Sequence, residues 1–164
     1  MSESTNREST TSTNQPPAEG PALTGVRRTG LITMPPLAML FLGLGVVQIF
    51  LAGFGVFDLN GAELGSKDET AFDPHRFVGF LMTAVALLLL IAAIVARPGR
   101  RIVGLAVALL LIVAVLQGVL ASLGEDTAVF GGLHALFGIG SLGLASSILA
   151  ATRALSSRPA ADSA

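Results

Sequence analysis

The 164-residue sequence contains no cysteine, tryptophan or tyrosine, and only 13% of its residues are charged. The lack of cysteine excludes disulfides, thiolate metal sites, iron–sulfur clusters and cysteine nucleophiles. An ordinary soluble domain carries about 25% charged residues, so this composition argues against a soluble globular protein. A hydrophobic fraction of 52% also excludes a chain that is disordered throughout. Any aromatic belt at a membrane surface depends on the nine phenylalanines.

Four apolar runs have the length that a membrane-spanning helix needs, about 20 residues. None of them contains Asp, Glu, Lys or Arg, and none alternates in polarity as barrel strands do. The sequence therefore predicts an all-α integral membrane protein, an up-down bundle of four helices. We expect Pro35 and Pro36 to mark the start of the first helix. The predicted spans are residues 34–57, 77–96, 102–123 and 128–152.

Polar tails flank the four spans, and their basic residues predict the orientation. Residues 1–33 are rich in Ser, Thr, Pro and Glu, so we expect a disordered tail, and residues 153–164 form a second, short tail. The positive-inside rule predicts a multi-pass protein of the cell membrane with both termini in the cytoplasm. Only Lys67 and Arg76 lie on the other side. The basic residues on the cytoplasmic side are Arg7, Arg27, Arg28, Arg97, Arg100, Arg101, Arg153 and Arg158.

A weak internal repeat relates the two halves of the predicted bundle. Gln48 in the first span and Gln117 in the third each begin the pattern Q-x-x-L-A-small. His75 and His134 each begin the pattern H-x-x-x-G at the second and fourth spans. Because both hairpins cross the membrane in the same sense, the repeat predicts two helical hairpins related by a pseudo-twofold axis along the membrane normal. Counting along the helices places all four residues toward the outer face.

Small residues accompany both histidines at helical spacing, as in Gly79 and Thr83 after His75 and in Gly138 after His134. Two interpretations stay open. Small residues let membrane helices pack closely. They also leave room beside a helix for a flat ligand such as a planar macrocycle.

The two histidines are the candidate ligands of the chain, because neutral imidazole binds haem iron, copper and zinc. Two histidines are too few for a closed zinc site, and no span contains a carboxylate to complete one. They are enough for a haem, whose porphyrin supplies four nitrogens. We therefore predict a haem between the second and fourth helices near the outer face, with His75 and His134 as axial ligands.

Three further side chains belong to the candidate site. Arg76 is placed to bond a haem propionate, or instead to pair with Asp73 or with lipid headgroups. We expect Asp73 to cap the second helix, with a proline in its first turn. Gln48 and Gln117 are placed to hydrogen-bond either between helices, which is the default, or to a ligand.

These residues resemble one four-helix half of the haem A synthase family. The features that carry the resemblance are His75-Arg76 at the second helix, Gln117-Gly118 in the third and His134 in the fourth. The resemblance implies that His75 and His134 are a pair of haem ligands. With one histidine pair and no cysteine, the resemblance implies a relative that binds a b-type haem, in electron transfer or haem handling, rather than haem A synthase activity itself. In size, the chain also resembles a group of small four-helix bacterial membrane proteins of unknown function, DUF6220.

Two other functions remain as alternatives. The first is a cofactor-free structural or accessory membrane protein, in which the histidines only bond between helices. The second is a transporter or proton-relay subunit, which the lack of acidic residues in the spans disfavours. The expected partner is the lipid bilayer, with a redox protein or a second copy of the chain as further candidates. The sequence offers no residues for nucleic-acid binding.

Overall fold

The computed structural model describes residues 25–58 and 69–157, and all regular structure in these ranges is helical. The all-helical prediction is therefore confirmed. Four helices are long and apolar enough to cross a membrane, in agreement with a multi-pass membrane protein. The predicted tail residues 1–24 and 158–164 lie outside the described ranges.

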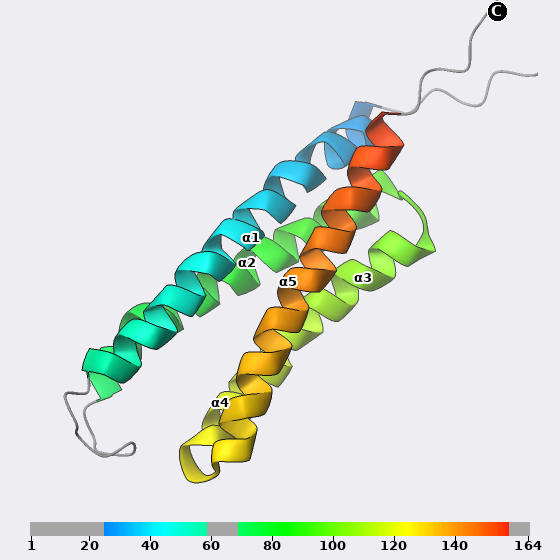
Figure 1. Cartoon of the computed structure of the whole chain (residues 1–164). Helices are drawn as coiled ribbons and strands as arrows, with labels where there is room; N and C mark the ends of the chain where they lie inside the picture. The colour runs from blue at the N-terminus through cyan, green and yellow to red at the C-terminus, as the bar shows by residue number, and fades with distance from the viewer. Residues whose placement is uncertain (1–24, 59–68, 158–164) are drawn as a thin grey trace, which may run out of the picture.

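The helices follow the order of the predicted spans, with one irregular turn in the third. Figure 1 shows the start of α1, the turn between α2 and α3 and the end of α5 together at one end of the molecule. We call this end the inner end and the opposite one the outer end. The elements are α1 (Gly25–Asp58), the 3₁₀ helix η1 (Glu69–Phe72), α2 (Asp73–Ala96), α3 (Arg100–Leu111), the π-helical turn η2 (Ile112–Leu116), α4 (Gln117–Asp126) and α5 (Ala128–Ser156).

Helix α1 begins at Gly25, nine residues before position 34, where the apolar run starts. Pro35 and Pro36 lie inside the helix, so the prediction that they mark its start is wrong. Each proline removes the N–H that would bond the carbonyl four residues back. Membrane helices tolerate this loss when hydroxyl groups and neighbouring helices support the backbone. The Thr33 hydroxyl donates to the Gly30 carbonyl at 3.0 Å, which is not one of the two carbonyls that the prolines free, those of Leu31 and Ile32.

Helix packing follows a simple order of neighbours. Helix α1 packs against α2 and α5, α2 also packs against α3, and α5 contacts α3 and α4. Among the described residues, α2 and α5 have no close backbone contact, and neither do α1 and α3. Helix α4 is packed against α5 and the adjoining η2 only. The two hairpins are therefore joined mainly through their inner portions, and Figure 1 shows them diverging toward the outer end.

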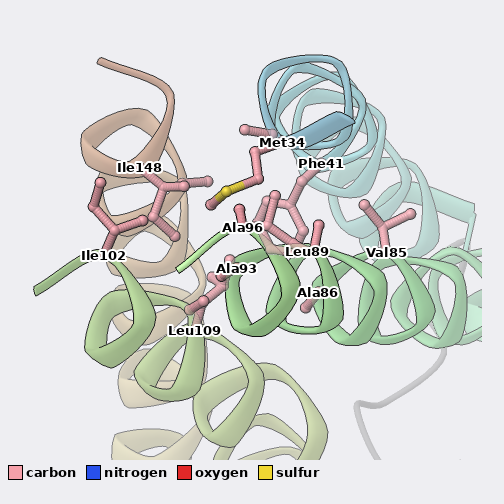
Figure 2. Close-up of a cluster of buried hydrophobic side chains, with 14 of the residues drawn as sticks. Met34, Phe41, Val85, Ala86, Leu89, Ala93, Ala96, Ile102, Leu109 and Ile148 are labelled. Carbon is pink, nitrogen blue, oxygen red and sulfur yellow. The ribbon is translucent and has the colours of Figure 1, made fainter. Parts of the chain in front are cut away.

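The hydrophobic core lies in the inner half of the molecule. Figure 2 shows side chains from α1, α2, α3 and α5 converging there. Met34, Phe41, Leu89 and Ile148 have no exposed surface. In α4, by contrast, Leu120 alone is buried. The outer half is therefore held by few apolar contacts, and polar contacts between helices carry more weight there.

Candidate histidine site

Gln48 of α1 and His75 of α2 bond to each other twice across the first hairpin. The side-chain Nε2 of Gln48 donates to the carbonyl oxygen of His75 at 2.9 Å. The imidazole Nδ1 of His75 lies 3.2 Å from the carbonyl oxygen of Gln48. Because a carbonyl oxygen only accepts, Nδ1 must carry the proton in this contact. We call this reciprocal pair of hydrogen bonds a Gln–His clamp.

The second hairpin contains the same clamp. Nε2 of Gln117 in α4 donates to the carbonyl oxygen of His134 in α5 at 3.0 Å. Nδ1 of His134 lies 3.1 Å from the carbonyl oxygen of Gln117. The residues of the internal repeat therefore make equivalent contacts in both hairpins. The default expectation, that both glutamines bond between helices, is confirmed.

The glycine of each H-x-x-x-G pattern makes room for the clamp. A Cβ atom at Gly79 would lie 3.4 Å from Nε2 of Gln48, and one at Gly138 would lie 3.6 Å from Nε2 of Gln117. A larger side chain would displace the amide from the histidine carbonyl one turn earlier. The structure thus explains these two glycines by the space that the glutamine amide needs. This explanation differs from the two interpretations of the sequence, close helix packing and room for a flat ligand.

The two imidazole rings meet between the hairpins. Their centroids lie 6.1 Å apart, and the ring planes are tilted by 51°. Each ring has its Nδ1 bonded within its own hairpin, and neither Nε2 bonds to any described residue. The described residues contain no group of three or more His, Cys, Asp or Glu that could hold a metal ion alone. Within residues 25–58 and 69–157, the candidate ligands at this site are therefore the two histidines themselves.

A π-helical turn brings Gln117 into register with His134. The buried residues of α1 and α3 share one spacing, but Gln48 follows Phe41 by seven residues, whereas Gln117 follows Leu109 by eight. A π-helical turn absorbs one extra residue without changing the direction of the helix. The turn η2 lies between Leu109 and Gln117 and has this effect. The sequence reasoning missed η2, although the unequal spacing is visible in the sequence.

Thr83 of α2 ties the first hairpin to this turn. Its hydroxyl lies 3.1 Å from the carbonyl oxygen of Gly79 and 3.4 Å from that of Val113 in η2. A π-helical turn leaves a carbonyl without its usual helical partner, so a hydroxyl from a neighbouring helix is well suited to bond there. The sequence reasoning placed Thr83 in a stripe of small residues and did not anticipate this contact.

Arg76 lies at the outer end, beside His75 in the chain. Its Nη1 lies 3.5 Å from Oδ1 of Asp73, and both side chains are substantially exposed. The expected cap is not formed, because the N-cap residue of α2 is Phe72 and it makes no side-chain cap bond. Asp73 instead lies in the first turn and pairs with Arg76. The structure therefore joins Gln48, Gln117 and both histidines in one site, with Arg76 at its outer edge.

Comparison with known proteins gives one match. No curated protein and no solved structure matches the chain, and no comparison supports the resemblance to haem A synthase. Residues 48–124 are similar to a family of unknown function, DUF6220. This range includes both glutamines and His75 and ends before His134.

Proposed function

We propose that this chain is a membrane protein that binds a b-type haem between α2 and α5, with His75 and His134 as axial ligands. Its role would be electron transfer or haem handling. The observation that carries the proposal is the facing pair of imidazoles, each anchored through Nδ1 in its own hairpin.

The protonation of the rings supports this proposal. Histidines that bind a metal usually donate their other ring N–H to a carbonyl or carboxylate, which fixes the tautomer and the ring orientation. In both clamps Nδ1–H donates to the backbone carbonyl of the glutamine, so Nε2 is the nitrogen that keeps a lone pair on each ring. Gln48 and Gln117 are then positioning residues rather than ligands.

The closeness of the rings also supports the proposal. Their centroids lie 6.1 Å apart, so both imidazoles are within reach of one group bound between α2 and α5. The absence of close backbone contact between α2 and α5 leaves the side chains to span the gap. A bound haem would supply one-electron chemistry, while this chain would hold it and keep it near the outer face.

We further propose an up-down bundle in the plasma membrane, with both termini in the cytoplasm. The support is the position of the arginines at the ends of the spans. Arg27, Arg97, Arg100 and Arg153 all belong to the inner end, whereas Arg76 belongs to the outer end. In this orientation the histidine pair faces the outer leaflet, and Arg76 could exchange its contact with Asp73 for one with a haem propionate. A redox protein or a second copy of the chain would be the partner.

One observation favours the alternative of a cofactor-free structural protein. The clamps already use Nδ1 of both histidines and the amide of both glutamines within the protein. A residue with such a contact stabilises the hairpin without any ligand. The two functions therefore differ in what Nε2 does, and that difference can be measured.

The test is an optical spectrum of the protein purified in mild detergent from haem-replete cells, oxidised and then reduced. We expect a low-spin b-type spectrum that is lost in both His75→Ala and His134→Ala. Phe80→Ala is the matched control, because this α2 side chain is 76% exposed and should leave the spectrum unchanged. A colourless protein that takes up no added hemin would favour the structural alternative.

A further inference from the structure

We propose that water-soluble molecules reach the histidine pair from the His134 side, because the Phe72 ring covers His75 and no phenylalanine ring of the described residues contacts His134 in the same way. This inference rests on the proposed function, in which His134 would be the more accessible of the two residues that hold the haem. The asymmetry itself is a property of the protein without haem.

Phe72 covers His75 at the outer end of α2. The Phe72 ring meets the His75 imidazole edge to face, with centroids 6.4 Å apart and planes at 87°. Gly55 of α1 makes room for the ring, since a Cβ atom there would lie 2.8 Å from ring carbons of Phe72. The ring is half-buried, and it places apolar surface over the outer side of His75.

The second hairpin has a glycine at the equivalent position. Gly131 precedes His134 by three residues, as Phe72 precedes His75. The glycine on the facing helix is also repeated. Gly124 in α4 follows Gln117 by seven residues, just as Gly55 in α1 follows Gln48.

There the two helices approach through their backbones instead of through a ring. A Cβ atom at Gly124 would lie 3.0 Å from the backbone nitrogen of Gly131. A Cβ atom at Gly131 would meet nothing within 4 Å. Among the described residues, the aromatic ring in contact with His134 is that of His75. The two hairpins thus share the clamp but not the phenylalanine cover, because a glycine stands where Phe72 stands in the first hairpin.

Carbethoxylation of the haem-free protein with diethyl pyrocarbonate tests this asymmetry. The chain has two histidines, so mass spectrometry of the peptides gives each rate with the other as an internal reference. We expect His134 to react several-fold faster than His75. Phe72→Ala should raise the rate at His75 and leave that at His134 unchanged. Phe77→Ala is the control, because this nearby α2 side chain is 68% exposed.

Equal rates in the unchanged protein, or a rate ratio that Phe72→Ala does not alter, would overturn the inference. Diethyl pyrocarbonate can enter the detergent micelle, so a second measurement uses a charged reagent that stays in water. The chain has no cysteine, so His75→Cys and His134→Cys each carry a single thiol. A cationic methanethiosulfonate should label the second variant faster. Neither measurement uses haem, so failure of hemin uptake tests the proposed function separately.

Discussion

A glutamine side chain that is removed from water loses its hydrogen bonds to water, and in both hairpins the carbonyl oxygen of a histidine accepts one from its amide nitrogen. In the first hairpin the clamp satisfies the Gln48 amide nitrogen and the His75 Nδ1, whereas the buried Oε1 of Gln48 has no hydrogen-bond partner among the described residues. In each hydrogen bond of the clamp the donor is a side chain and the acceptor is a backbone carbonyl. Residue type alone therefore predicts that the glutamine and the histidine interact, but not which atoms bond. The sequence identified all four residues of the clamps, and the structure was needed to show their reciprocity.

The substitution Gln117→Met removes the side-chain donor of the second clamp and keeps the volume. We expect the free energy of unfolding to fall by about 1 kcal/mol, the usual scale of one interhelical hydrogen bond in a membrane protein. Titration of the detergent-solubilised protein with sodium dodecyl sulfate measures this. Ser147→Ala is the control, because that exposed hydroxyl bonds within its own helix. An equal effect of both substitutions would contradict a role for the clamp.

The substitution Gly79→Leu should displace the Gln48 amide from the His75 carbonyl. We expect it to destabilise the protein by about 1–3 kcal/mol, as overpacking does in a closed site. Gly43→Leu in α1 should have little effect, because a Cβ atom there meets nothing within 4 Å. The same detergent titration compares the two variants, and similar midpoints would rule out the proposed reason for Gly79.

The helices show how far hydrophobic runs alone define elements. Run length predicted four membrane-spanning helices, and the described residues contain four helices long and apolar enough to span a membrane. Their ends were less predictable, because polar turns such as residues 25–33 extend a helix beyond its apolar run. The π-helical turn η2 lets α3 turn its buried face toward the core while Gln117 of α4 still faces His134. Predicting this turn requires knowing both contacts, and the hydrophobic pattern of the helix alone does not give them.

Deletion of one residue tests the role of η2. Removing Val115 should convert the turn to regular α-helix and keep both Leu109 and Gln117 in place. Removing Val46 from α1 has no such turn to absorb it, so Gln48 should rotate by about 100° relative to Phe41. Both valines are exposed. We expect the first variant to keep most of its stability and the second to lose it. The reverse order would contradict this account.

The whole molecule divides into an inner half held by apolar packing and an outer half held by the clamps. The fully buried side chains lie in the inner half and the middle of the helices, while the hairpins diverge toward the outer end. Charge and hydropathy predicted the spans and which ends carry the arginines. The position of the core along the spans could not be predicted, since all four runs are apolar along their whole length.

Two neighbouring leucines of α2 test where the core lies. Leu89 is fully buried, and Leu88 is 51% exposed on the face toward lipid. Leu89→Ala should reduce the free energy of unfolding by about 2–5 kcal/mol, because it leaves a cavity. Leu88→Ala should have a much smaller effect in the same assay. Comparable losses would indicate that the packing of α2 differs from the structure.

The most direct test of the central claim is a hemin titration of the haem-free protein in detergent, followed by absorption spectroscopy. The facing pair of imidazoles predicts one low-spin haem per chain. The double variant His75→Ala/His134→Ala should bind none under the same conditions. Retained stoichiometric binding in the double variant, or no binding by the unchanged protein, would contradict a haem site at the histidine pair.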